Sequence, residues 1–311
     1  MGWSLRGKAQ LVLERTVNAL VPESAFIAFS GMRRHKRVLG VYPNLLRPKT
    51  FSEKILHRMV FDRRPILTML QDKYAAREYV RERVGDHVLP SLYWVTKNPA
   101  DIPFDKLPDR FVVKATHGCG WTYLVPDKSR VNRDDVMAKC VSWLSYNYYN
   151  RSTPEWAYKH IEPCIIVEEF ISDGTGLTPT DYKFYVFGGR VHLIWAMTGR
   201  YVDLRSDAYT PSWHRIDRKR RGKSIGMPLP RPPHLDEMIR CAEILGADLD
   251  FVRVDLYDAG KVYFGEMTLY PSGGGEMSDP EANRYFGGLW DPSFGRTGRR
   301  SQKDPAIRAS R

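Results

Sequence analysis

Two acidic residues near the end of the chain, Asp255 and Glu266, have the type and spacing of a metal-binding pair. Residues 251–257 alternate between two faces, which is typical of a half-buried strand, and the dipeptide 259–260 (Ala-Gly) predicts a two-residue hairpin turn. Two carboxylates that converge from adjacent strands repel each other unless a cation lies between them. Oxygen ligands suit Mg²⁺, which usually takes one or two carboxylates plus substrate phosphates. The hairpin therefore predicts a magnesium site.

The two-residue turn also fixes an expected register. Arg253 lies opposite Glu266 and Asp255 lies opposite Phe264, so the two acids become diagonal neighbours, roughly 7–8 Å apart at the backbone. An exposed hairpin edge with scattered charges is the alternative interpretation.

A glycine-bearing loop follows an apolar strand in the segment 111–120. Lys114 lies near the end of that strand, and His117, Gly118 and Gly120 follow it. Glycines let backbone N–H groups approach phosphate oxygens, and a lysine adds a point charge. The segment matches neither a P-loop nor a G-x-G-x-x-G pattern, so an ordinary hairpin with an exposed lysine remains the alternative.

Two acids, Glu168 and Glu169, end a buried strand and precede Phe170 and Ile171. A segment of this kind, between two sheets, offers backbone donors and acceptors to an adenine edge and a carboxylate to ribose hydroxyls. A strand end with solvated acids is the alternative.

A glycine turn at 188–189 predicts a hairpin from 181 to 197. Asp181 and Lys183 share one face of its first strand, and Arg200 follows the second strand. These charges could point into a common cleft. A cross-strand ion pair on an exposed surface, which contributes little, is the alternative.

A D-x-D pair, Asp248 and Asp250, raises a different possibility, because such pairs mark the metal site of many nucleotide-sugar glycosyltransferases. Its place between a predicted helix and a predicted strand also fits an ordinary polar turn. The histidines form no ligand-spaced set.

The elements that must position these residues alternate between helices and strands. The region 1–66 is mostly helical in this interpretation, with Thr50 or Ser52 as a cap, and 202–233 is a polar, proline-rich excursion. Helices are predicted for 66–84, 132–147 and 234–245, and strands for 88–96, 122–125 and 164–171.

The chain has 311 residues, enough for two packed units, and a formal net charge of +12. That charge favours anionic partners. The basic cluster 215–221 and the basic tail 294–311, which we expect to be disordered, lack the interleaved aromatics of a nucleic-acid module, so no nucleic-acid partner is predicted.

The four cysteines form no C-x-x-C pair, which excludes a recognisable zinc site or disulfide framework and favours a reducing cytoplasm. No stretch approaches the ~18 apolar residues of a membrane span. Residues 8–20 could form a basic amphipathic helix that packs on the body or touches the inner face of a membrane.

The order of these motifs along residues 40–292 resembles the ATP-grasp superfamily, and within it the TupA-like branch linked to teichuronopeptide and other surface-polysaccharide biosynthesis. The motifs that carry the resemblance are Phe51-Ser-Glu-Lys-Ile55, Asp72-Lys-Tyr74, Phe111-Val-Val-Lys-Ala-Thr-His-Gly118, Ile166-Val-Glu-Glu-Phe170, Asp181-Tyr-Lys-Phe184 and Phe264-Gly-Glu-Met-Thr268.

The resemblance implies an α+β fold in which two subdomains clamp ATP and Mg²⁺. Its expected boundaries are a helical region 1–66, subdomains 67–171 and 172–293, and the tail 294–311. Among the residues that would bind nucleotide, Lys73 and Lys114 would contact the phosphates. The loop that contains His117, Gly118 and Gly120 would cover the phosphates. The backbone from Glu168 through Glu169 and Phe170 to Ile171 would hold adenine, and Asp181 would reach ribose. Lys183, Arg200 and Arg253 would neutralise the transferred phosphate, and Asp255, Glu266 and Thr268 would face the metal.

Thr268 departs from the Asn that many ATP-grasp enzymes have at this position, which puts a second metal in doubt. The implied activity is a carboxylate–amine ligase with an acyl-phosphate intermediate, acting on a carboxylate-bearing saccharide or amino acid and an amine. A glycosyltransferase, an ATP-grasp kinase and a sugar-binding module are the alternatives.

Overall fold

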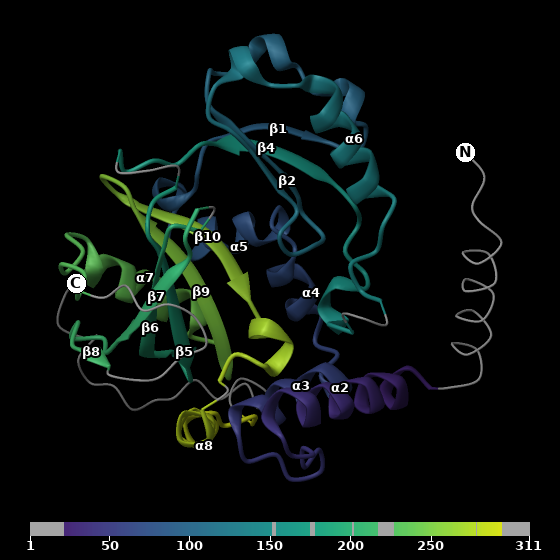
Figure 1. The fold of residues 1–311 in the computed structure, drawn as a ribbon, viewed down its shortest axis with the longest axis vertical. Coiled ribbons are helices and arrows are strands. Elements are labelled where there is room, and N and C mark those ends of the chain that lie inside the picture. Colours follow the sequence, from purple (N-terminus) through teal and green to yellow (C-terminus); the bar gives the residue numbers. More distant parts are fainter. Residues whose placement is uncertain are drawn as a thin grey trace.

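The computed structural model describes residues 22–150, 154–174, 178–200, 202–216, 227–277 and 279–293. The helix predicted for 8–20, the basic tail and most of the 215–221 cluster lie outside these ranges. The described residues form helices and two antiparallel sheets, which confirms the predicted α+β class (Figure 1). None of the described helices has the length and apolar character needed to cross a membrane.

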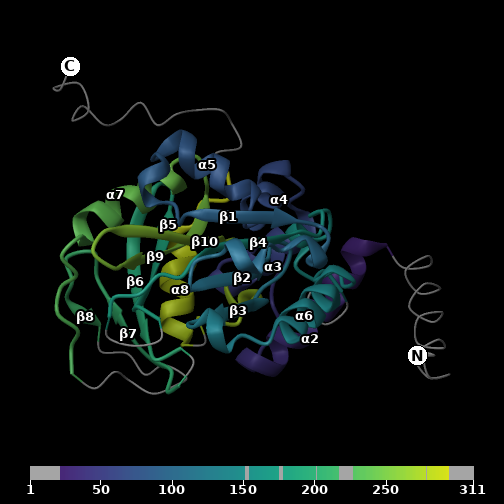
Figure 2. The same ribbon diagram turned by 90° about the horizontal axis from the view of Figure 1, so that it is seen from above.

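The smaller sheet has four strands in the order β1-β4-β2-β3. Helix α6 lies beside this sheet (Figure 2). Its Val136 and Cys140 are buried in the apolar core that it shares with the sheet. The bounds of these elements are β1 Leu92–Thr96, β2 Phe111–Ala115, β3 Thr122–Val125, α6 Arg133–Leu144 and β4 Ile165–Glu169.

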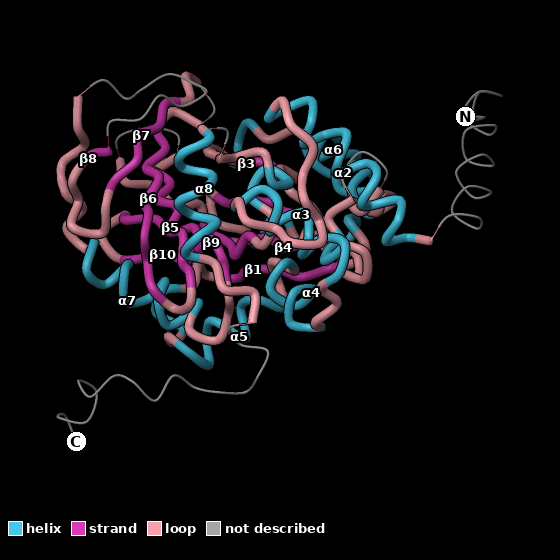
Figure 3. Tube along the Cα trace, turned by 90° about the horizontal axis from the view of Figure 1, so that it is seen from below, coloured by secondary structure: helices cyan, strands magenta, loops and turns pink. Residues whose placement is uncertain are grey.

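The larger sheet has six strands in the order β10-β9-β5-β6-β7-β8. Helices α7 and α8 pack on it (Figure 3), and Phe187 of β5 stacks on Phe286 of α8 with ring centroids 5.8 Å apart. The bounds are β5 Asp181–Phe187, β6 Arg190–Thr198, β7 Arg205–Tyr209, β8 Arg215–Ile216, α7 Leu235–Gly246, β9 Phe251–Asp258, β10 Val262–Thr268 and α8 Pro280–Leu289. Strands β7 and β8 lie in the segment predicted as an irregular excursion, so that prediction was wrong for 205–209 and 215–216.

Helices α2 (Glu23–Leu39) and α3 (Phe51–Phe61) join the core of the larger sheet through Ile27, Phe51 and Ile55. The predicted cap of α3 is Thr50. Its side chain accepts a hydrogen bond from the Glu53 backbone N–H, and the Glu53 carboxylate accepts one from the Thr50 N–H.

The helix predicted for 66–84 is two helices, α4 (Pro65–Gln71) and α5 (Ala75–Arg83). The chain breaks because Asp72 adopts an extended conformation and its side chain accepts a hydrogen bond from the Tyr74 N–H at 2.8 Å. The Lys73 N–H instead donates to the Thr116 carbonyl beyond β2 at 3.2 Å. The break therefore ties Lys73 to the end of the smaller sheet.

Candidate functional site

The hairpin of β9 and β10 brings the two predicted metal ligands together. Asp255 lies directly opposite Glu266, and Arg253 lies opposite Thr268. The prediction of diagonal acids was wrong because the ladder shifts by one residue between Phe264 and Glu266. This shift puts both carboxylates at one level of the sheet.

The bulge lies at Gly265. A Cβ added there would lie 2.9 Å from Cε2 of Tyr257 and 3.0 Å from the Asp255 carbonyl oxygen, so only glycine allows this close approach. The predicted two-residue turn was also wrong. The strands are joined by three residues, 259–261, with Gly260 at φ 80° and a hydrogen bond from the Ala259 N–H to the Lys261 carbonyl.

Asp255 is buried among cations. The Arg253 guanidinium donates to both of its carboxylate oxygens, from Nε and Nη2, each at 2.7 Å. Lys183 of β5 also pairs with Asp255, and it lies 2.8 Å from Oδ2 of Asp181. Burial and the neighbouring Arg253 would lower the pKa of Lys183, but the carboxylates of Asp181 and Asp255 outweigh both and raise it. Lys183 therefore stays charged.

Glu266 is more open than Asp255, with a quarter of its side chain exposed. Lys73 and Arg253 each lie 3.6 Å from one of its oxygens. Burial would raise the pKa of Glu266, but the charges of Lys73, Arg253 and Lys183 outweigh it and hold the pKa at about 2. The carboxylate is therefore ionised at any physiological pH.

Asp181 lies deeper, at the start of β5. Its Oδ2 accepts from Arg200 at 3.1 Å, whereas Oδ1 is buried without a hydrogen-bond partner in the described part of the chain. Burial is the strongest influence and raises the pKa of Asp181. An orphaned acceptor in a cleft wall is a natural partner for a ligand hydroxyl.

Lys114 and Glu168 face each other across β2 and β4 and form a close ion pair. Arg77 of α5 lies 3.7 Å from the other Glu168 oxygen. The Glu168 carboxylate is thus paired with two cations and does not line the cleft. The role predicted for the backbone of 168–171 beside adenine stays a prediction.

The end of β4 contacts residues beside both sheets. Oε2 of Glu169 accepts from the backbone and side chain of Ser91, and Oε1 accepts from the Tyr263 hydroxyl at 2.9 Å. Phe170 follows, with Arg110 stacked 4.4 Å from its ring centroid, and Ile171 continues the apolar wall.

The glycine loop is built around Trp121. A Cβ on Gly118 would lie 2.3 Å from that indole, so the close packing requires glycine. The Gly118 carbonyl accepts from Nζ of Lys73 at 2.6 Å, and Gly120 lines the cleft. His117 does not. Its ring is buried behind the loop, 5.1 Å from Trp121, and Nε2 bonds the Trp143 carbonyl, so the predicted ligand is a packing residue.

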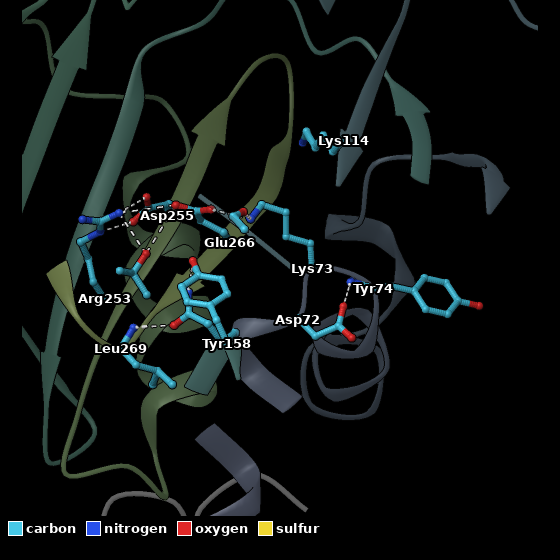
Figure 4. A network of polar contacts seen from close by, with 12 residues as sticks. Asp72, Lys73, Tyr74, Lys114, Tyr158, Arg253, Asp255, Glu266 and Leu269 are labelled. Atoms are coloured by element: carbon cyan, nitrogen blue, oxygen red, sulfur yellow. Dashed lines mark hydrogen bonds and ion pairs between the residues drawn. The ribbon is translucent and has the colours of Figure 1, made fainter. Parts of the chain in front are cut away.

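One cleft lies between the two sheets, with a volume of about 1150 Å³ including its open mouth. The predicted site residues that line it are Lys73, Lys114, Gly120, Glu169, Phe170, Ile171, Asp181, Arg200, Asp255 and Glu266. Lys73, Asp255 and Glu266 converge at one end, with Arg253 behind Asp255, while Lys114 stands apart on the smaller sheet (Figure 4). The cleft also has a largely apolar side, whose members are Val112, Leu124, Phe170, Ile171 and Pro179. Its shape and charge suit a flat apolar ring joined to a polyanion.

Several residues near the cleft escaped the sequence analysis. Cys119, Thr178 and Tyr257 line it, and Glu276 lies 3.4 Å from Nη1 of Arg253. Glu155 is reached by the charges of Arg253 and Glu266. The alternation of residues 251–257 could have identified Tyr257, which shares a strand face with Asp255, but Glu155 and Glu276 have no sequence pattern.

The donor set fits Mg²⁺ held together with a phosphate chain. In the described ranges no three His, Cys, Asp or Glu side chains gather closely enough to hold a metal ion by themselves. Asp255 and Glu266 supply two carboxylates that face the cleft, which is the number Mg²⁺ takes when phosphates and water complete its shell. Thr268 donates to Glu266 at 3.4 Å and accepts from Arg253 at 2.9 Å, so its hydroxyl is already engaged.

The D-x-D pair does not form a metal site. Asp250 is buried and pairs with Arg58 at 3.0 Å and Arg64 at 2.7 Å, and it accepts from the Trp290 indole N–H at 2.8 Å. Asp248 points to Arg83 at 2.9 Å and is half exposed. The two aspartates therefore do not share a cation, which removes the sequence basis for a glycosyltransferase site.

Comparison with solved structures gives distant similarities. The D-alanine–D-alanine ligases of Bacillus anthracis and Helicobacter pylori are each 16% identical, with TM-scores of 0.41 and 0.40. The alignments cover 66% and 72% of this chain, and this chain spans 59% and 62% of those two proteins. The ATP-grasp ligase PsnB, complexed with a minimal precursor, is 13% identical over 66% of this chain and 53% of its own, with a TM-score of 0.36. No curated protein matches the sequence significantly.

The family comparison is decisive. The model of the TupA-like ATPgrasp family matches residues 53–290, which is well over half of the chain. ATP-grasp enzymes bind ATP together with Mg²⁺, so this match confirms the predicted fold, enzyme class and cofactors. The chain belongs to the TupA-like ATP-grasp family.

Proposed function

We propose that this enzyme is an ATP- and Mg²⁺-dependent carboxylate–amine ligase that forms an acyl-phosphate. The observation that carries the proposal is the paired acids Asp255 and Glu266 at the end of a cleft whose cations come from both sheets. Lys73, Lys114 and Arg200 line this cleft, whereas Lys183 and Arg253 are buried behind its wall and pair with Asp255.

The proposed chemistry follows from charge. A substrate carboxylate can attack the terminal phosphate of ATP only when the charge of that phosphate is neutralised. Bound Mg²⁺ supplies part of this neutralisation. Lys73 reaches the cleft beside Glu266, and Arg253 and Lys183 stay protonated beside Asp255. These side chains would hold and orient the phosphate chain, and the predicted contact of Asp181 with ribose uses its orphaned oxygen.

The predicted adenine site is the apolar side of the same cleft. Phe170 and Ile171 offer backbone groups next to an apolar wall, and Glu169 is held away from it by Ser91 and Tyr263. The acyl-phosphate reacts with both amines and water, so the cleft would have to close over the bound substrates to exclude water.

We place the acceptor beyond Arg253. The turn 272–275 follows β10, and Ser272 there has a positive φ of 48°, a strained conformation for a residue with a side chain. Glu276 holds the outer side of Arg253. Burial raises the pKa of Glu155, which also feels the charges of Arg34, Arg253 and Glu266, to about 7.

The cellular role in surface-polysaccharide biosynthesis is proposed from the family resemblance alone, with a carboxylate-bearing saccharide or amino acid as donor. A cytoplasmic location, at the inner face of a membrane, is part of the same proposal.

The metal site is tested with Glu266→Gln and Asp255→Asn, by measuring ATP affinity with Mg²⁺ and with EDTA. We expect Mg²⁺ to strengthen binding by wild type and to have at least tenfold less effect in either variant. Asp248→Asn is the matched control and keeps the wild-type response. Undiminished Mg²⁺ dependence in Glu266→Gln, the less buried of the two, would refute the proposed site.

The reaction type is tested by screening phosphate release from ATP across uronic acids and amino acids, with and without added amines. A ligase gives equal ADP and free phosphate only when carboxylate and amine are both present. A phosphorylated product without free phosphate would identify a kinase instead. Displacement of a bound fluorescent nucleotide by UDP-sugars but not by ATP would support the glycosyltransferase alternative.

A further inference from the structure

One surface far from the nucleotide cleft combines positive charge with exposed apolar side chains. Residues 24–52 contain six Lys or Arg and no Asp or Glu. Within this stretch Phe29, Val41, Tyr42 and Leu46 are 58%, 59%, 67% and 87% exposed. Helix α2 and the loop that follows it lie at the lower edge of the molecule (Figure 1).

The helix divides its residues sharply. Ile27, Gly31 and His35, spaced at one turn, face the protein, where Ile27 and His35 are buried and Gly31 lies against Leu56. The opposite face presents Phe29, Arg33, Lys36 and Arg37, of which Phe29 lies 5.7 Å from the Arg33 guanidinium. The inner face of α2 therefore packs against the core. In the described part of the chain, nothing packs in the same way against the outer face.

The loop after α2 continues this surface. Nζ of Lys36 lies 5.5 Å from the ring centroid of Tyr42, which joins the loop to the helix. We call the set Phe29, Arg33, Lys36, Arg37, Val41, Tyr42, Leu46 and Arg47 the basic–apolar face.

The most exposed member of the face is held on an ordered turn. Oδ1 of Asn44 accepts from the N–H groups of Leu46 and Arg47 at 3.1 and 2.9 Å. The Glu53 carboxylate accepts from the Asn44 and Lys49 N–H groups at 2.8 and 2.9 Å. A single exposed leucine is ordinary. Here the leucine is held by a network of hydrogen bonds and lies beside exposed aromatic residues and four basic side chains. A surface with this composition is typical of an interfacial membrane contact.

We propose that the basic–apolar face docks on an anionic lipid bilayer. The basic side chains would lie at the lipid phosphates, and Tyr42, Leu46 and Phe29 would enter the headgroup region. Charge complementarity identifies the partner, because the cations are spread round apolar tips with no acid in the stretch. This contact is distinct from the predicted helix 8–20 and does not depend on the ligase proposal.

The placement would also orient the active site. The inner side of α2 borders the turn after β10, since Nη2 of Arg34 donates to the Ser272 carbonyl at 2.8 Å and Val38 lies beside Gly275. A helix is about 10 Å thick. A bilayer on the outer face of α2 would thus lie about one helix diameter from the acceptor turn.

The test is co-sedimentation of the full-length protein with lipid vesicles at physiological salt. One set of vesicles is phosphatidylcholine alone, and the other contains roughly one-third phosphatidylglycerol, an anionic lipid. We expect binding to the anionic vesicles only. Arg33→Gln with Lys36→Gln and Arg37→Gln should weaken the partition coefficient about a hundredfold, because each basic residue near an anionic surface contributes roughly fivefold. Tyr42→Ser with Leu46→Ser should weaken it at least tenfold at the same net charge.

The matched controls remove the same number of positive charges, or an exposed apolar side chain, from surfaces outside the basic–apolar face. Lys106→Gln with Arg130→Gln and Lys139→Gln takes three exposed cations from the smaller sheet's surface, and Val141→Ser takes an exposed apolar residue from α6. Both should bind as wild type does, and all variants should keep the wild-type melting temperature.

Four results would overturn the proposal. They are failure of the wild type to bind anionic vesicles, undiminished binding by either face variant, equal loss in the charge control, and a change of oligomeric state in Tyr42→Ser with Leu46→Ser without lipid. The second result would assign any binding to other segments, and the third would assign it to net charge. The last would assign the face to a second copy of the chain.

Discussion

At the scale of single residues, the site is a balance of buried opposite charges. Arg253 and Lys183 surround Asp255, and Lys73 lies beside Glu266. Each of these cations would be expensive to bury alone. The site thus holds these cations charged and in place by pairing them with Asp255 and Glu266, the acids proposed to bind the metal.

Glu266 should give the protein a stability that depends on pH. Its pKa is about 2 in the folded state and near 4.5 when unfolded, so its ionised form stabilises the fold above pH 4.5. That contribution is lost as the pH falls from 4.5 to 2. We expect Glu266→Gln to melt below wild type at pH 6 and to converge with it near pH 2. A gap that persists at pH 2 would mean that packing, not charge, explains the loss.

Glu155 should have the opposite pH dependence. Its folded pKa is raised to about 7 by burial, so the folded state keeps a proton that the unfolded state releases near 4.5. Stability is therefore greatest below 4.5 and falls as the pH rises to 7. Melting curves of Glu155→Gln should lack this decline, whereas Glu162→Gln, an exposed partner of Lys97, should retain it. Parallel curves for Glu155→Gln and wild type would contradict the raised pKa.

At the scale of elements, sequence patterns predicted the strands, helices and caps that depend on local residue spacing. The hairpin of β5 and β6, the helix α7 and the cap of α3 follow from Gly188–Gly189, from apolar spacing and from Thr50. The patterns failed where a single backbone contact determines where a helix ends or how two strands are aligned. The break at Asp72 depends on a hydrogen bond from the Tyr74 N–H, and the bulge at Gly265 depends on a close backbone approach; neither leaves a period in the sequence.

The bulge at Gly265 can be tested directly. In Gly265→Ala the new Cβ would meet the Tyr257 ring and the Asp255 carbonyl, and relieving those contacts should cost about 1–3 kcal/mol. The same shift would separate Asp255 from Glu266 and weaken the Mg²⁺ effect on ATP affinity. Gly288→Ala in α8, which has open space at its Cβ, is the control and should be neutral or slightly stabilising. A Gly265→Ala protein with normal stability and Mg²⁺ response would show that the bulge does not set the site.

At the scale of the whole molecule, the cleft requires both sheets, and no stretch of sequence shows how they meet. The domain boundaries stay a prediction, but the contacts across the cleft are specific. Lys73, anchored to Thr116 beyond β2, reaches Glu266 of β10, and Glu169 of β4 reaches Tyr263. The motifs predicted which residues gather, whereas their partners Glu155 and Glu276 come from segments with no pattern.

A second whole-molecule feature is the buried charge cluster around Asp250, which ties β9 to α3 and α8. Arg58 stacks 4.4 Å from the Trp290 ring centroid and pairs with Asp250, which also accepts from that indole. Burial would raise the pKa of Asp250, but Arg58 and Arg64 outweigh it and lower the pKa.

Asp250→Asn would leave Arg58 buried without its anion, so we expect a loss of about 3–5 kcal/mol, measured by urea unfolding. Asp248→Asn, which breaks only the exposed pair with Arg83, should change stability by less than about 1 kcal/mol. At a temperature where Asp250→Asn remains folded, its Mg²⁺-dependent ATP affinity should equal that of wild type, because the cluster lies outside the cleft. The reverse pattern, with stability kept and metal-dependent nucleotide binding lost, would return the D-x-D pair to the role of a metal site and place the chemistry on the other side of the sheet.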